Sequence, residues 1–206
     1  MNYWIWLCAW LPFAAWADGE PANWVQLLKQ TGPGYYRYEE TRELELASQP
    51  WHAQGFMLTD ATGNLVKLQT VPQRVIMAIA GEQLYYWDPI NKQRHSASIE
   101  AAGDAAQQIA AFRAILQGRI EQLQADYEIA LHPLGNGWQL RFTPKAAAAE
   151  TGLPSIEIAG NGDTRQRDIS IRQADGEITR YRIGASAPEA GGGMTIDALL
   201  REAAGE

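Results

Sequence analysis

Cysteine is nearly absent from this chain of 206 residues. The only one, Cys8, lies in an apolar N-terminal stretch that we expect to be removed from the mature protein. A chain without thiols can form no disulfide, has no thiolate nucleophile and offers no cysteine ligand to a metal. We therefore expect an exported domain that is stabilised by its hydrophobic core alone.

Residues and motifs that carry catalysis are also scarce. The three histidines, His52, His95 and His132, do not have the spacing of a metal site. There is no G-x-S-x-G nucleophile motif and no phosphate-binding P-loop. Most of the acidic residues near position 40 share a face opposite the tyrosines, where contact with solvent explains them without catalysis. The sequence therefore predicts a protein that is not an enzyme and that requires neither a cofactor nor a metal.

Positive charge is in deficit. The 17 Lys and Arg residues against 24 Asp and Glu residues give a net charge of −7. Nucleic-acid binding depends largely on basic contacts to phosphates, and attachment to an anionic membrane surface requires basic clusters, so we expect neither. Beyond the N-terminal stretch, no apolar run reaches the roughly 20 residues that a membrane-spanning helix needs.

The first 17 residues have the form of an export signal. An apolar run over residues 3–16 ends in Ala15-Trp16-Ala17, whose small residues suit signal peptidase, and the chain becomes polar at Asp18. An uncleaved anchor is one alternative, but the run is shorter than a bilayer requires. A lipoprotein signal at Cys8 is another, but small residues do not precede this cysteine. We expect cleavage after Ala17 and a mature protein in the periplasm.

Short segments in which apolar and polar residues alternate dominate the mature chain. In the first of them, tyrosines and leucines occupy one face, and glutamates occupy much of the other. Turn residues separate the segments, and their regular spacing is typical of an antiparallel meander, not of βαβ units. The predicted strands cover residues 35–46, 53–59, 64–70, 74–80, 83–87, 92–99, 127–131, 138–143, 155–159, 165–172 and 177–183.

Helical periodicity interrupts the strands in a few places. A short amphipathic helix is expected near residues 23–29, and a longer one over 104–124, which Gly118 is expected to divide. Residues 146–152 suit one helical turn, and 195–204 a short terminal helix. We divide the chain into a signal peptide (1–17), one domain (18–184) and a flexible C-terminal tail (185–206).

Two charged residues depart from the alternation in the first predicted strand. Glu40 and Arg42 fall on its apolar face, between Tyr38 and Leu44. Either they pair with residues of a neighbouring strand, or they belong to a site at the rim of a cavity. The sequence does not choose between these two interpretations.

The number of strands and the shortage of helices together bear on function. One meander of this size cannot cover its apolar face unless the sheet closes or curls. In a closed sandwich, the inward-facing aromatic residues would only fill the hydrophobic core. A sheet curled around a helix would instead leave an apolar concave surface, which is suited to binding.

The order of these features resembles the LolA-type outer-membrane lipoprotein carriers, in particular a LolA-like subgroup. The segment GEQLYYWDP at 81–89 is similar to the family's DG-x-x-LW-x-YDP, and FRAILQG at 112–118 to its FRALLAG-like helix. WQLRFTP at 138–144 is similar to W-x-L-x-L-x-P, IEIAG at 156–160 to I-x-x-I-x-L-x-G, and DGEIT at 175–179 to the last hairpin. Other members have a lid-holding arginine before the proline that here is Pro72, whereas this chain has Val71.

The resemblance implies a mainly β fold with few helices, in which a curved antiparallel sheet forms an open half-barrel and helices lid its apolar concave face. It implies a monomeric periplasmic carrier that binds acyl chains of lipoproteins, or of another lipid such as an aryl-polyene ester, and ferries them to the outer membrane. The implied partners are an inner-membrane donor complex and an outer-membrane acceptor, each bound transiently. The alternative is an envelope sensor or structural β-domain that binds a protein partner.

Candidate site residues follow from the alternation in the strands and the periodicity in the helices, combined with this resemblance. The positions expected to line the cavity are Tyr36, Tyr38, Phe56, Leu58, Met77, Tyr86, Trp138, Leu140 and Phe142. The positions expected to form the lid are Trp24, Leu28, Ile109, Phe112 and Leu116.

Overall fold

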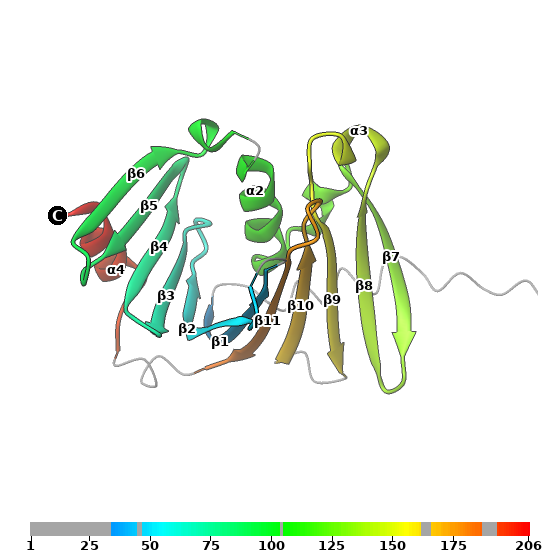
Figure 1. The fold of residues 1–206 in the computed structure, drawn as a ribbon, viewed down its shortest axis with the longest axis horizontal. Helices are drawn as coiled ribbons and strands as arrows, with labels where there is room; N and C mark the ends of the chain where they lie inside the picture. The colour runs from blue at the N-terminus through cyan, green and yellow to red at the C-terminus, as the bar shows by residue number, and fades with distance from the viewer. Residues whose placement is uncertain (1–33, 45–46, 104, 162–165, 187–192) are drawn as a thin grey trace, which may run out of the picture.

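Figure 1 shows the computed structural model, which describes residues 34–44, 47–103, 105–161, 166–186 and 193–206. The predicted signal peptide and the predicted helix that contains Trp24 and Leu28 lie outside the described residues. Within the described part of the chain, no helix is both long enough and apolar enough to cross a membrane.

One antiparallel sheet of eleven strands forms the body of the molecule. Its two ends do not pair with each other, so the sheet stays open, and the predicted fold class is confirmed. Every strand lies within a few residues of its predicted position. The strands are β1 (Gly34–Glu43), β2 (Trp51–Thr59), β3 (Leu65–Val71), β4 (Val75–Ala80), β5 (Gln83–Asp88), β6 (Gln93–Ser98), β7 (Tyr127–Leu134), β8 (Gly137–Pro144), β9 (Ser155–Asn161), β10 (Gln166–Arg172) and β11 (Ile178–Ala185).

The strand order explains where the helices go. It runs β6-β5-β4-β3-β2-β1-β11-β10-β9-β8-β7, so β1 and β11 pair at the centre and two meanders extend outward from them. The two edges, β6 and β7, are consecutive in the chain. The connection between them must therefore cross from one edge to the other, and in Figure 1 its helix α2 (Ala105–Leu116) stands between the two arms of the curved sheet.

Short helices complete the crossing and the chain. The 3₁₀ turns η1 (Glu100–Ala102) and η2 (Ile120–Leu123) flank α2, while α3 (Ala146–Ala149) and α4 (Ile196–Ala204) follow later. Gly118 lies between α2 and η2 with φ of +68°, a conformation that glycine adopts without strain. The prediction that this glycine divides the helical segment is therefore confirmed.

Two separate hydrophobic cores form on opposite faces of the sheet. The inner core lies on the concave face, where α2 and η2 pack on strands from both meanders. The outer core lies on the convex face of β2, β3 and β4, beneath α4. Its buried members are Leu58, Val66, Leu68, Ile76, Ala78, Leu199 and Ala203.

The C-terminal segment differs from the flexible tail expected over residues 185–206. The predicted terminal helix is present as α4, but it is packed against the sheet, with Leu199 and Ala203 fully buried. Thr195 caps its first turn, and Glu202 forms a two-pronged ion pair with Arg74 of the sheet, at 2.8 and 2.9 Å. Burial of an amphipathic face makes this helix part of the folded domain.

Candidate functional site

Helix α2 covers the middle of the concave face. Ala111, Ala114 and Ile115 are buried in the inner core, and the ring of Phe112 lies 5.3 Å from that of Tyr181 on β11. The expected lid residues Ile109, Phe112 and Leu116 all pack against this core. Their helix covers this part of the concave face.

Polar contacts at one end of α2 attach it to the sheet. Arg113 Nε and Gln117 Nε2 donate to the carbonyl oxygen of Gly63, at 2.8 and 2.7 Å. Arg113 Nη1 also donates to the carbonyl oxygen of Gly81, at 3.1 Å. Gly63 and Gly81 lie in the β2–β3 and β4–β5 turns, so one helix side chain fastens two hairpins. Neither Arg113 nor Gln117 was expected to be a site residue, although both lie in the segment FRAILQG, which resembles the family's helix.

Seven of the nine expected lining residues lie on the concave face. Tyr38, Trp138, Leu140 and Phe142 are buried in the inner core, and Tyr36 packs against it. Met77 and Tyr86 are partly exposed and lie on the same face, further from the centre of the sheet. Cross-strand pairing places Tyr36, the buried Met57, Lys67 and Met77 in one row across the strands. Tyr86 pairs with Met77 and extends this row.

The other two expected lining residues lie on the opposite face. Leu58 is buried in the outer core, and Phe56 packs against that core and lies 5.3 Å from Tyr35. Met57 faces the inner core instead. The period of two in this strand was predicted correctly, but its phase was wrong, and a shift of one residue exchanges the faces of the whole strand.

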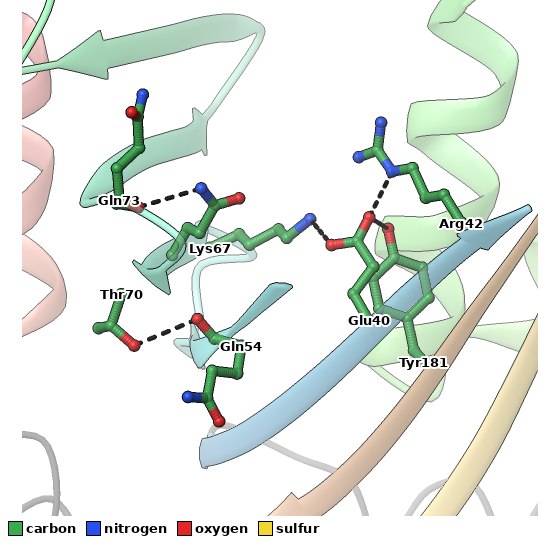
Figure 2. A network of polar contacts seen from close by, with 8 residues as sticks. Glu40, Arg42, Gln54, Lys67, Thr70, Gln73 and Tyr181 are labelled. Carbon is green, nitrogen blue, oxygen red and sulfur yellow. Dashed lines mark hydrogen bonds and ion pairs between the residues drawn. The ribbon is translucent and has the colours of Figure 1, made fainter. Parts of the chain in front are cut away.

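A cluster of charged and phenolic groups interrupts the apolar concave face (Figure 2). Glu40 of β1 is 1 % exposed and forms an ion pair with Lys67 of β3. It also accepts hydrogen bonds from Arg42 Nε, at 2.7 Å, and from the Tyr181 hydroxyl, at 3.2 Å. Lys67 reaches Glu40 diagonally across β2, where its own partner is Met57 and that of Glu40 is Ala53. Gly55 lies between these two partners and has no side chain to block the way.

Aromatic rings surround the cations of this cluster. Lys67 Nζ lies 5.1 Å from the ring centroid of Tyr38 and 5.3 Å from that of Tyr181. The guanidinium of Arg42 lies 4.9 Å from the ring of Trp51. These distances suit cation–π attraction, which is stronger where water is excluded.

Burial shifts the pKa values within the cluster. Loss of hydration lowers the pKa of Lys67, although the Glu40 carboxylate opposes the shift. Loss of hydration, together with the nearby charge of Glu40, raises the pKa of both Tyr38 and Tyr181 above the ordinary tyrosine range. The two phenols are therefore neutral hydrogen-bond donors at physiological pH.

Several buried donors of the inner core lack an acceptor. Among the described residues, the Tyr38 and Tyr127 hydroxyls and Trp138 Nε1 have no hydrogen-bond partner. Trp138 lies over Gly160, where a Cβ would come within 2.7 Å of the indole ring, so only glycine fits beneath it. An unpaired buried donor costs roughly 1–3 kcal/mol.

The structure shows the first of the two arrangements considered for Glu40, a pairing across strands. Glu40 pairs with Lys67, on a strand two positions away in the sheet. Lys67 was missed, although a lone lysine in the apolar segment Leu65-Val66-Lys67-Leu68 is a signal. A buried glutamate on an apolar face requires a cation nearby, and the sequence pattern makes Lys67 a candidate for that cation.

The convex face of β1 and β8–β11 is polar and differs from the site just described. It carries ion pairs such as Arg141 with Glu157, at 3.0 Å, and Arg182 with Asp168, at 3.2 Å. A hollow of about 370 Å³ lies among these charges, not among the predicted lining residues. Across the described residues, no group of three or more His, Cys, Asp or Glu is placed to hold a metal ion.

Comparison with known proteins shows which protein family matches the chain. A family model described as outer membrane lipoprotein carrier protein LolA-like matches residues 14–205. Among curated proteins, none matches the chain.

Solved structures also resemble this one, at low sequence identity. A LolA superfamily protein from Nitrosomonas europaea has 10 % identity and a TM-score of 0.42, over 81 % of this chain and 94 % of that one. A putative outer membrane lipoprotein-sorting protein domain from Vibrio parahaemolyticus has 8 % identity and a TM-score of 0.45, over 86 % and 96 %. The MucA/MucB complex of Pseudomonas aeruginosa has 13 % identity and a TM-score of 0.46, over 86 % of this chain and 59 % of that one.

Proposed function

Because the chain belongs to the LolA-like family of outer membrane lipoprotein carriers, we propose that it binds acyl chains on its concave face and carries them through the periplasm. The cargo is a lipoprotein or another acylated lipid, received from an inner-membrane donor and passed to an outer-membrane acceptor. No bond is made or broken in this process, so the protein acts as a carrier and not as an enzyme.

The observation that carries the proposal is the way α2 covers the concave face. Phe112 and its neighbours bury an aromatic and aliphatic surface that would otherwise face water, while polar contacts from Arg113 and Gln117 hold the helix at one end. A cover attached in this way can leave the sheet without breaking any strand pairing. Movement of α2 would then expose Tyr38, Leu140 and Phe142 to a ligand.

The energetics suit a carrier with such a cover. Transfer of a 16-carbon chain from water is worth on the order of 12 kcal/mol, at about 0.8 kcal/mol per methylene. Such a ligand would be held too tightly to be delivered if the empty face were fully exposed. Contacts between α2 and the sheet in the empty state offset part of this energy, so both loading and release stay possible.

The test is the lipid content of the protein purified from its own envelope, by solvent extraction and mass spectrometry. Phe112→Asp should abolish the co-purification of lipid or acylated protein and leave the sheet folded, because a carboxylate cannot be buried against the acyl chain that α2 has to cover. Leu134→Asp is the matched control, since Leu134 at the end of β7 is 56 % exposed.

Two results would contradict the proposal. One is an unchanged lipid content in the Phe112→Asp protein, which would exclude a lid role for α2. The other is a wild-type protein that carries no extractable lipid but retains a stable protein partner in pull-downs. This second result would favour the alternative, a sensor or structural domain that binds a protein.

A further inference from the structure

A buried ion pair on an apolar binding face requires an explanation. The Glu40–Lys67 pair is surrounded by inner-core residues, and Glu40 is almost completely buried. Pairs of this kind contribute little to stability, because desolvation of both charges offsets their attraction. A face that bound only hydrocarbon would gain by having apolar residues at both positions.

The charges of the cluster do not balance. The carboxylate of Glu40 is shared by Lys67 and Arg42, so the direct ion pairs of the cluster contain two cations and one anion. Loss of hydration lowers the pKa of Arg42, but Glu40 raises it, so the pKa is raised on balance. Tyr181 and the half-buried Glu177 make smaller contributions in the same direction. Lys67 has a hydrogen bond to Glu40 and no other among the described residues, although an ammonium group has three donors.

The unpaired groups around Lys67 are donors, not acceptors. The Tyr38 hydroxyl is buried without a partner, and its ring lies against Lys67 Nζ. The side chain of Lys67 is 10 % exposed, and its ammonium group lies beside the Tyr38 and Tyr181 rings on the concave face. A ligand that brings oxygen acceptors with negative charge would satisfy these donors and give Lys67 a second anionic partner, since it shares Glu40 with Arg42.

The surface beside Lys67 suits the apolar part of such a ligand. Met77 is its cross-strand partner on β4, and Tyr86 is the partner of Met77 on β5, so the three side chains form a row on the concave face. Met77 and Tyr86 are partly exposed. A chain lying along this row would place its head next to Lys67.

We propose that Lys67 and Tyr38, held in place by Glu40, bind the anionic head of an acyl ligand, through carboxylate or phosphate oxygens. This inference rests on the proposed acyl-chain binding and adds to it the chemical class of the head group. Glu40 acts as a positioning residue, because it orients Lys67 and does not contact the ligand.

The experiment compares three ligands with the same 12-carbon chain: dodecanoate, dodecyl phosphate and dodecanol. Each displaces a fluorescent fatty-acid probe from the purified mature protein, below the micellar concentration. The double variant Glu40→Gln with Lys67→Met removes both charges together, so that neither remains buried alone. The matched control is Glu157→Gln with Arg141→Met, which removes an ion pair from the convex face. Tyr38→Phe is a second, milder variant that removes only the hydroxyl.

We expect the wild-type protein and the control to bind at least one anionic ligand about tenfold or more tightly than dodecanol, as one charge-assisted hydrogen bond implies. The double variant should lose this preference and keep its affinity for dodecanol, and Tyr38→Phe should reduce the preference. The relative affinities of dodecanoate and dodecyl phosphate identify which head the site takes.

Each contrary result overturns a different statement. An equal affinity of the wild-type protein for all three ligands, or an unchanged preference in the double variant, overturns the head-group site and leaves acyl-chain binding in place. If none of the three ligands displaces the probe from the wild-type protein, the proposed function fails, and the head-group site fails with it.

Discussion

At the scale of single residues, Arg113 has a role that its position in the sequence does not reveal. It stands on the helix that covers the concave face and donates to backbone carbonyl oxygens in two separate hairpin turns. The relatives are expected to have a lid-holding arginine on the sheet, before a proline that here follows Val71. In this chain the arginine that attaches the helix to the sheet is on the helix itself.

Replacement of Arg113 by alanine should therefore loosen α2. Loss of its hydrogen bonds is expected to lower the free energy of unfolding by about 1–3 kcal/mol and to speed the release of a bound fatty-acid probe. Stopped-flow fluorescence measures the release rate, and urea denaturation measures the stability. Arg172→Ala, at the exposed end of β10, is the control. Identical release rates for Arg113→Ala and the wild-type protein would exclude this role.

The buried tyrosines give a prediction about alkaline pH. Burial raises the pKa of Tyr38, Tyr127 and Tyr181 in the folded protein, whereas in the unfolded chain they ionise near pH 10. Their contribution to stability is therefore complete below pH 10 and is lost as the pH rises toward their folded-state pKa values. Absorbance at 295 nm should show these three residues ionising only together with loss of the circular-dichroism signal. Ionisation near pH 10 without unfolding would contradict the burial of these hydroxyls.

The face on which a strand residue lies could be predicted from the sequence only where apolar residues alternate with polar ones. In β8, Trp138, Leu140 and Phe142 alternate with polar residues, so the inner face is unambiguous. In β2 both faces are apolar, and nothing in the segment distinguishes Met57 from Phe56 and Leu58. Lys67 could not be assigned a partner, because its contact with Glu40 depends on how three strands are arranged.

At the scale of elements, the two halves of the sheet differ in the polarity of their outer face. Strands β3 and β4 bury side chains on both faces, and their outer face is covered by α4. The outer face of β1 and β8–β11 carries ion pairs and requires no cover. The continuous apolar run Val75-Ile76-Met77-Ala78-Ile79 is typical of a strand that is buried on both faces. Another segment of the chain must therefore cover its outer face.

Truncation of a buried side chain in α4 should reduce the stability of the whole domain. Leu199→Ala removes a fully buried side chain and is expected to cost about 2–5 kcal/mol in the free energy of unfolding, measured with urea. Ala198→Ser, on the exposed side of the same helix, should change it by less than about 0.5 kcal/mol. If Leu199→Ala were as stable as the wild-type protein, α4 would not be part of the cooperative fold.

Most elements could be predicted from the sequence, but their packing partners could not. The eleven strands follow from alternation and turn residues, and the terminal helix from its own periodicity. That this helix docks on the convex face of β3–β5 depends on the completed sheet, far from it in the sequence. For this reason the docking of α4, in a segment expected to be a flexible tail, was not predicted.

At the scale of the whole molecule, the curved sheet separates two chemically distinct surfaces. The concave face is apolar, covered by α2 and interrupted by one buried charge cluster, and the convex face is partly charged and partly covered by α4. The strand order requires the chain to cross from β6 to β7 at opposite edges, and α2 lies on this crossing, packed on the concave face. The central claim is that acyl chains bind on the concave face.

Methionine methyl groups report on both faces and allow the most direct measurement. Met57 and Met77 lie on the concave face, and Met194 packs against the outer core. With ¹³C-labelled methionine methyls and a spin-labelled fatty acid, NMR should show broadening of Met57 and Met77 and an unchanged Met194 resonance. Broadening of Met194 alone, or of no methionine at saturating ligand, would contradict binding on the concave face.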